Sequence, residues 1–147
     1  MELKMHVYGK IKKPIAEVFD AVYNPKKLSS YFTTGGASAP LDAGKTVTWD
    51  FKDFPGAFPV YIKETILDKK IVFEWASQAG NFNITVEFTF EALDSGATRV
   101  DVRESGWKET NPKALEEVGS HQGGWMHMLC CLKMHVEHGI NMREFFF

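Results

Sequence analysis

A helical run near the C-terminus most constrains what this chain can fold into. Mostly apolar residues recur there every three or four positions, which aligns them along one stripe of an α-helix. The stripe consists of Val118, Gln122, Trp125, Leu129, Leu132, Val136 and Ile140. Pro112 can open this helix and Gly139 can close it with a left-handed cap. A helix of this kind requires an apolar surface to pack against.

Three glycines interrupt the first half of this run, at Gly119, Gly123 and Gly124. In a helix interior each glycine costs about 1 kcal/mol relative to alanine. The glycines therefore indicate a bend, or a place where a neighbouring backbone approaches closely. We predict a short first turn, a break near Gly119 and then the main helix.

The upstream sequence supplies the apolar surface. Residues 2–11 alternate between apolar and polar side chains, which is typical of a half-buried strand. After Pro14 the period changes to that of a short helix ending at Asn24, and a second short helix is expected over residues 26–32. Residues 33–40 are small, polar and rich in breakers, which predicts a mobile surface loop. Five strand-like runs follow, at residues 47–51, 60–66, 71–75, 84–90 and 100–104.

Each of these runs has one apolar and one polar face, as in an antiparallel sheet that is covered on one side only. The order predicts an α+β fold, in which a curved antiparallel sheet of six or seven strands wraps around the long C-terminal helix. A length of 147 residues fits one domain over residues 1–147. A cavity between helix and sheet is natural where bulky rings hold the walls apart.

Charge and composition exclude several classes of protein. The chain has 17 basic and 19 acidic residues, a net charge of -2 and no basic run, so nucleic acid is not an expected partner. Signals for secretion and for a membrane span are both missing. Cys130 and Cys131 are adjacent and cannot readily bridge each other on a helix, which suits a reducing cytoplasm. The aromatic content of 14% can fill a dense core or line a cavity for an apolar ligand.

Several motifs together resemble one known family. They are Ile11 to Phe19, Asn24-Pro25 to Tyr31-Phe32, Ile71-Val72-Phe73-Glu74-Trp75, Ala97-Thr98-Arg99-Val100, and Gly124-Trp125 followed by Leu129, Leu132-Lys133 and Gly139. Their order and spacing, over nearly the whole chain, resemble the Hsp90 ATPase activator homologue-like family. That family lies within the START-related, helix-grip superfamily, also called SRPBCC or polyketide cyclase-like. The resemblance implies a helix-grip fold with an internal pocket that opens near the short helices and loops.

We predict that aromatic residues and a few polar ones line this pocket. The predicted ligand-binding residues are Tyr31, Phe32, Trp49, Phe51, Ile62, Glu64, Phe73, Trp75, Phe88, Glu104, Gln122, Trp125 and Leu129. Glu64 and Glu104 are in phase with the apolar sides of their strands, so either they point into the pocket or a strand end or bulge turns them to solvent. Gln122 and His121 can supply hydrogen bonds to the same ligand, or they can be ordinary surface residues.

Three further features lie outside this set. His127, Cys131, His135 and His138 share the helix face opposite Trp125, where such residues can bind zinc or copper. Because no carboxylate joins them, we favour a solvated or subunit-contact face and predict no metal site. Residues 33–40 and 53–58 are the expected gate loops. The terminal segment Phe145–Phe147 is too apolar for water and is expected to fold back on the domain or to meet a second subunit.

The favoured function is non-enzymatic binding of a small, largely apolar or amphipathic ligand, either a lipid or an aromatic compound. We assign no catalytic residue and expect no cofactor, because no nucleophile is paired with a base. One alternative is a protein-interaction module that resembles the activator domain of the Hsp90 co-chaperone, with a chaperone or another protein as its partner. A second alternative is a cyclase- or hydrolase-type enzyme that uses Glu64 or Glu104. The chain is expected to be a monomer or a homodimer.

Overall fold

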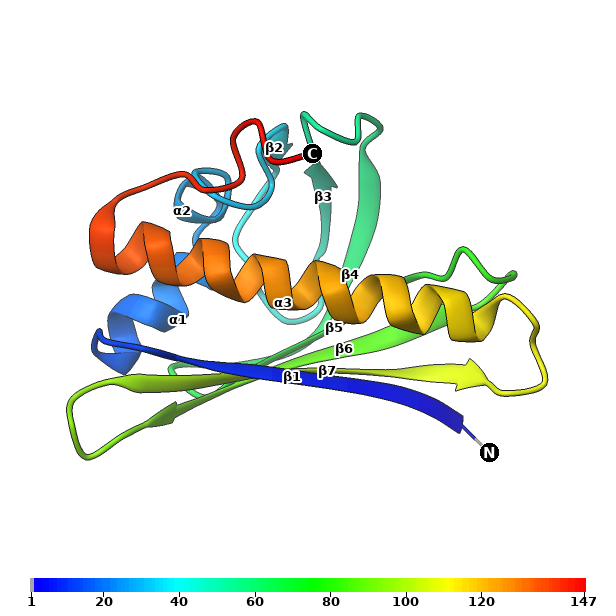
Figure 1. Cartoon of the computed structure of the whole chain (residues 1–147), viewed down its shortest axis with the longest axis horizontal. Coiled ribbons are helices and arrows are strands. Elements are labelled where there is room, and N and C mark those ends of the chain that lie inside the picture. The colour runs from blue at the N-terminus through cyan, green and yellow to red at the C-terminus, as the bar shows by residue number, and fades with distance from the viewer. Residues whose placement is uncertain (1) are drawn as a thin grey trace.

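A seven-stranded antiparallel sheet curves around one long helix in the computed structural model, which describes residues 2–147 (Figure 1). The strands are β1 (Glu2–Ile11), β2 (Gly36–Ala37), β3 (Thr46–Asp50), β4 (Phe58–Ile66), β5 (Lys70–Ala76), β6 (Asn83–Ala92) and β7 (Thr98–Lys108). The helices are α1 (Ile15–Tyr23), α2 (Pro25–Leu28) and α3 (Ala114–His138). The strand order in the sheet is β1-β7-β6-β5-β4-β3-β2. The predicted α+β helix-grip fold is confirmed.

The strands form where apolar and polar residues alternate strictly in the sequence, as predicted. In β1, Met5, Val7 and Ile11 are buried, while the intervening side chains are exposed or half-buried. In β6, every second residue from Ile84 to Phe90 is buried. Burying these inner faces against α3 supplies about 1.5–3 kcal/mol for each large apolar side chain. The outer faces carry charged residues instead.

The short helices follow β1 and close one end of the sheet. Pro14 is the N-cap of α1, and Asn24 separates α1 from α2, with its side chain accepting a hydrogen bond from the amide of Lys26 at 3.0 Å. The helix α2 is shorter than predicted: it ends at Leu28, and the residues up to Phe32 form turns.

The segment at residues 33–40 is held more firmly than a mobile loop would be. Thr33 is fully buried, and its hydroxyl lies 3.1 Å from the Ser29 hydroxyl. Gly36 and Ala37 form the edge strand β2, paired with Asp50 and Trp49 of β3. This short pairing is the seventh strand, and it anchors the segment to the sheet.

The helix α3 runs unbroken from Ala114 to His138, so the predicted break near Gly119 is wrong. Glycine raises the cost of the helix, but side chains on either side of Gly119 anchor both flanking turns to the sheet. The end of the helix was predicted correctly. Gly139 adopts a left-handed conformation with φ of 67°, and its amide donates to the carbonyl of His135 at 2.8 Å.

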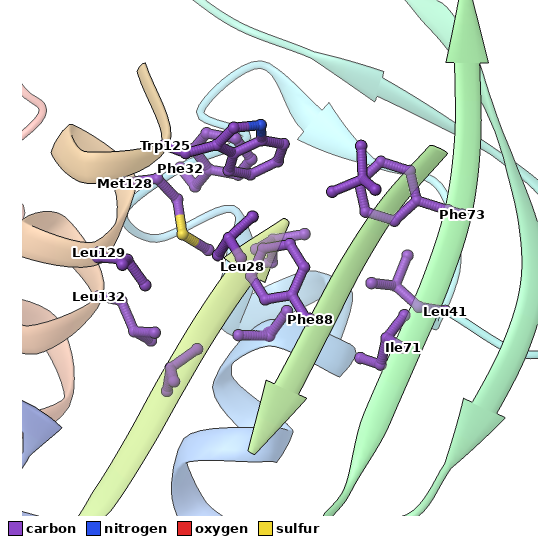
Figure 2. Packing of buried hydrophobic residues seen from close by; sticks show 14 of the residues in the cluster. Leu28, Phe32, Leu41, Ile71, Phe73, Phe88, Trp125, Met128, Leu129 and Leu132 are labelled. Atoms are coloured by element: carbon purple, nitrogen blue, oxygen red, sulfur yellow. The ribbon is translucent and has the colours of Figure 1, made fainter. Parts of the chain in front are cut away.

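The buried face of α3 is broader than the predicted stripe. Trp125, Met128, Leu129 and Leu132 point toward the core, where they meet residues of the sheet and of α2 (Figure 2). Gln122 and Ile140, both in the predicted stripe, are exposed. Ile140 lies beyond the end of the helix, so the helical period does not apply to it.

None of the helices within residues 2–147 is long and apolar enough to cross a lipid bilayer.

Candidate functional site

Glu104 of β7 lies at the base of the site and holds three side chains together. Glu104 is only 1% exposed, because it lies on the inner face of the sheet between Met5 of β1 and Val86 of β6. The indole N–H groups of Trp75 and Trp125 both donate to its carboxylate, Trp75 Nε1 at 3.2 Å. Nδ1 of His121 lies 3.0 Å from Oε1 and 3.2 Å from Oε2. Glu104 thus connects β7 to β5 and to α3.

Glu117, in the first turn of α3, makes a second cluster of hydrogen bonds. Its Oε2 accepts from the Ser77 hydroxyl at 2.6 Å and from the Trp107 indole at 2.9 Å. Its Oε1 accepts from the backbone amide of Gln78 at 2.9 Å. Burial alone would raise the pKa of Glu117, but these three donors together outweigh burial and lower it. Glu117 therefore fixes the start of α3 to the β5–β6 connection as a carboxylate.

His121 lies between the two carboxylates. Its Nε2 is 3.5 Å from Oε1 of Glu117, while Nδ1 faces Glu104. Burial would lower the pKa of His121, but the hydrogen bond to Glu104 and the negative charges of Glu104 and Glu117 raise it overall. The ring also packs edge-on against Trp75 and Trp107. His121 in its cationic form thus neutralises one charge of the pair of carboxylates.

A cavity of about 1030 Å³ lies over this network. It is bounded by one face of α3, by the connection between β3 and β4, and by the C-terminal segment after α3. Aromatic rings form most of its walls. They include Phe32, Phe51, Phe58, Trp75, Trp125 and Phe147. This volume is at the upper end of the range for small-molecule sites, and the concave aromatic lining is typical of them.

The C-terminal segment closes one side of the cavity through a buried arginine. Arg143 is 8% exposed, and its Nε lies 3.0 Å from Oδ2 of Asp53 in the β3–β4 connection. Its guanidinium also lies over the rings of Phe51 and Phe147, with Cζ 4.8 Å and 5.3 Å from their centroids. This ion pair and the cation–π contacts hold two loops of the chain together.

The phenylalanines that follow Arg143 fold back onto α3. The rings of Phe146 and Phe147 lie 4.1 Å and 5.0 Å from the His127 ring, and Phe147 also contacts Phe54. Burial lowers the pKa of His127, the nearby charge of Arg143 lowers it further, and Asp53 opposes them only in part. Phe145 projects fully into solvent.

The structure places eleven of the thirteen predicted ligand-binding residues in three locations. Four of them line the cavity: Phe32, Phe51, Trp75 and Trp125. Six others are packed in the core behind these walls: Tyr31, Trp49, Ile62, Phe73, Phe88 and Leu129. Their rings support the cavity walls, since Phe73, for example, contacts both Trp75 and Trp125. Glu104 lies beneath the wall, where two cavity-lining indoles cover it.

Glu64 and Gln122 lie away from the cavity. A β-bulge at Lys63 shifts the register of β4, so that Ile62 pairs with Phe73 but Glu64 pairs with Val72. The shift turns Glu64 to the outer face, where its side chain is 43% exposed and lies 3.3 Å from Lys70. Gln122 is exposed on α3 and is not part of the cavity wall, whereas the neighbouring His121 is.

The cysteine and histidines at helical spacing do not all converge, although the Cys131 thiol lies 3.7 Å from Nε2 of His127. Cys131 is fully buried rather than on the outer face of α3. His135 stacks on Tyr31, with the ring centroids 5.2 Å apart, while His127 faces the terminal phenylalanines. Within residues 2–147, no three histidine, cysteine or acidic side chains gather in a way that could hold a metal ion.

Several residues of the site were not identified from the sequence. The roles of Glu117 and Arg143 depend on partners 38–40 and 90 positions away, and neither residue belongs to a recognisable motif. Two of the cavity walls do correspond to sequence predictions. One is the expected gate loop at residues 53–58, and the other is the terminal phenylalanine segment, which was expected to fold back on the domain or to meet a second subunit. The glycines of α3 predict a bend or a close approach of another backbone, whereas in the structure they line the cavity in an unbroken helix.

A curved antiparallel sheet wraps around α3 and leaves a cavity beside the helix. This architecture defines a START-related, helix-grip protein. A family model for the Activator of Hsp90 ATPase homolog 1-like protein matches residues 12–137, and the chain belongs to this family. Among curated proteins, none matches the sequence significantly.

Solved structures share the fold at low sequence identity. Protein SSP2350 from Staphylococcus saprophyticus superimposes with a TM-score of 0.81 and 23% identity over 96% of each chain. The Aha1 dimer from Colwellia psychrerythraea gives a TM-score of 0.78 and 19% identity, covering 93% of this chain and 98% of that one. DynU16, from the dynemicin biosynthetic locus, gives 0.79 and 24% identity, covering 94% of this chain and 48% of its own. At these identities the likeness concerns the fold alone.

Proposed function

We propose that this protein binds a small, largely apolar molecule with a polar end in the cavity beside α3, without catalysing a reaction. The single observation that carries the proposal is the aromatic-walled cavity of about 1030 Å³. Dense packing normally fills such a space, so a cavity of this size suits a ligand of corresponding volume. The few polar groups in its wall, among them Gln78, Ser120 and Arg143, can orient that ligand.

The state of Glu104 supports a binding role over an enzymatic one. A general base must reach a proton of the substrate with a free oxygen atom. Both oxygens of Glu104 already accept hydrogen bonds from Trp75, Trp125 and His121, and the residue lies beneath the cavity wall. Glu64, the other carboxylate in the enzymatic alternative, is on the outer face of the sheet.

Blocking the cavity tests the proposal. Ser120 lies in the cavity wall, whereas Gln122 is exposed on the same helix and outside that wall. Ser120→Phe and Gln122→Phe therefore add the same ring in two positions, one of which fills the cavity. Native mass spectrometry and organic extraction of the wild type should identify a copurifying small molecule. We expect Ser120→Phe to lose it and Gln122→Phe to keep it.

Two outcomes would contradict the proposal. Retention of the molecule by Ser120→Phe would place it outside the cavity. A purified wild type that carries nothing, and that neither fatty acids nor aromatic compounds stabilise against heat, would also count against a ligand carrier.

A second candidate is a protein contact through the exposed phenylalanines at the rim of the cavity. Phe54, Phe145, Phe146 and Phe147 are each more than half exposed, an unusual cluster for a surface facing water. The partner would be a second copy of the chain, as in the Colwellia Aha1 dimer, or a chaperone, as the family description suggests. Sedimentation of the wild type and of Phe145→Ser tests self-association. A monomer at all concentrations would remove the second copy from consideration.

A further inference from the structure

His127 on α3 packs directly against the segment that closes one side of the cavity. We call residues 141–147 the lid, because Arg143, Phe146 and Phe147 all line the cavity. The rings of Phe146 and Phe147 lie 4.1 Å and 5.0 Å from the His127 ring, centroid to centroid. His127 is partly buried beneath them. Any change in the state of His127 therefore acts on contacts that keep the cavity closed.

Side chains, rather than backbone hydrogen bonds, hold the lid in place. In the part of the chain that the structure describes, the lid backbone makes hydrogen bonds only within the lid. The amide of Phe146 donates to the carbonyl of Arg143, and the amides of Arg143 and the next residue donate to the Asn141 side chain. The attachments to the rest of the chain are the Arg143–Asp53 ion pair, the partly buried Met142 and the phenylalanine rings. A segment with so few attachments opens at a much lower free energy than the sheet does.

The surroundings of His127 suit a neutral imidazole. The charged groups that act on it are Arg143 from the lid and Asp53 from the β3–β4 connection. Asp53 is already paired with Arg143, so it is not free to balance an imidazolium. On the same helix, the Cys131 thiol lies 3.7 Å from Nε2 and stays neutral, since burial raises its pKa to about 11. The Phe147 ring already carries the Arg143 cation, with Cζ 5.3 Å from its centroid.

We propose that protonation of His127 opens the lid, so that the cavity is closed at neutral pH and accessible at mildly acidic pH. In the open state the imidazolium is hydrated and separated from Arg143. This inference concerns access to the cavity and does not require the proposed function to hold.

The direction of the pH dependence follows from the burial of His127. Burial and the charge of Arg143 lower the pKa of His127 in the closed state, and Asp53 opposes them only in part. The closed state is therefore fully favoured above the ordinary histidine pKa of about 6.5. It loses stability as the pH falls through the lower pKa of the closed state.

Hydrogen exchange of the lid amides, measured by mass spectrometry without any ligand, tests this inference. The protection of each amide is taken relative to the urea-unfolded protein at the same pH, because the chemical exchange rate itself depends on pH. Between about pH 8 and about pH 5.5, the wild-type lid should lose about fivefold in protection. This range stays above the ordinary carboxyl pKa of about 3.9, so Asp53 keeps its charge throughout.

Three variants assign the effect to His127. His127→Phe keeps a ring against the phenylalanines but cannot be protonated, so its lid should be equally protected at both pH values. His127→Gln, which is also neutral, should behave in the same way, and the amides of β6 show that each variant is folded. His138→Phe makes the same substitution at the exposed end of α3 and should lose protection as the wild type does.

Two results would overturn the inference. Lid protection in the wild type that does not change with pH would show that His127 does not control the lid. A loss of protection that persists in both His127 variants would assign the opening to another group. Since no ligand enters the measurement, either result would leave the proposed function of the cavity standing.

Discussion

His121 and Glu104 join the long helix to β7 of the sheet, with Nδ1 of the imidazole 3.0 Å from a carboxylate oxygen that is shielded from solvent. The same carboxylate orders Trp75 and Trp125, which form part of the cavity wall. The geometry of the cavity therefore depends on a polar network that lies beneath it.

Removing the charge of Glu104 should destabilise the protein strongly. Glu104→Gln leaves the His121 cation without its main partner and puts an amide N–H₂ group among three donors, so we expect a loss of about 3 kcal/mol in the free energy of unfolding. Urea denaturation measures this loss. The matched control is Glu64→Gln on the outer face, where an exposed ion pair contributes less than about 1 kcal/mol. Equal losses in the two variants would mean that the network contributes no more than a surface pair does.

The same network should make stability fall as the pH rises above the ordinary pKa of histidine, about 6.5. The pKa of His121 is raised in the folded protein, despite burial, by its hydrogen bond to Glu104 and by the charges of Glu104 and Glu117. Its contribution to stability is therefore fully present below the unfolded-state pKa of about 6.5 and is lost as the pH rises through the higher folded-state value.

Urea denaturation of the wild type and of His121→Gln over a series of pH values tests this dependence. The advantage of the wild type should be greatest on the acid side of the series and should shrink as the pH rises. An advantage that stays constant across the series would show that His121 acts through packing alone. Measurements should stay above the acid range, because the lowered pKa of Glu117 adds a loss of stability there as the pH falls.

Breaking the Asp53–Arg143 pair should release the C-terminal segment. Asp53→Asn leaves the buried Arg143 cation without its partner, so the segment should leave its place beside the cavity. The amide of Phe146, which donates to the Arg143 carbonyl at 3.1 Å, should then exchange its hydrogen faster. Hydrogen exchange measured by mass spectrometry detects this. Glu144→Gln, in the same segment but exposed, should leave the exchange rate unchanged.

The two adjacent cysteines should differ sharply in reactivity. Cys130 is exposed, whereas Cys131 is buried, and burial raises the pKa of the Cys131 thiol to about 11. At about pH 8 the native protein should therefore take up one iodoacetamide group, at Cys130, because the reactive species is the thiolate. Peptide mass spectrometry locates the label, and unfolding in urea should expose the second thiol. Rapid labelling of Cys131 in the native protein would contradict its burial.

The sequence predicted most of the fold because its strands alternate strictly. The inner faces of β1 and β6 follow directly from their period of two, and the end of α3 follows from Gly139. The bulge in β4 could not be predicted in this way. Val60, Ile62, Glu64 and Ile66 keep their alternation in the sequence, and only the pairing with β5 shows that Lys63 is an extra residue. Glu64 and Ile66 therefore face outward.

The candidate site was predicted less well than the fold, for a different physical reason. Aromatic residues are equally suited to a core and to a cavity wall, so Trp49 and Trp75 could not be told apart by residue type. The polar contacts of the site join distant segments, as Asp53 and Arg143 do, and no local spacing indicates such a pair. The glycines of α3 are costly in a helix interior, but the surface they face depends on how the loops fold over the helix.

The position of Phe147 in the cavity wall has a practical consequence for anyone preparing this protein. A purification tag fused after Phe147 would begin at the cavity itself, and it could displace the phenylalanines or thread between them. The start of β1 lies on the other side of α3 (Figure 1). A tag at that end, or one removed by cleavage, leaves the cavity wall as it is. Screens for small molecules should therefore be run with the tag at each end of the chain before the protein is taken to bind nothing.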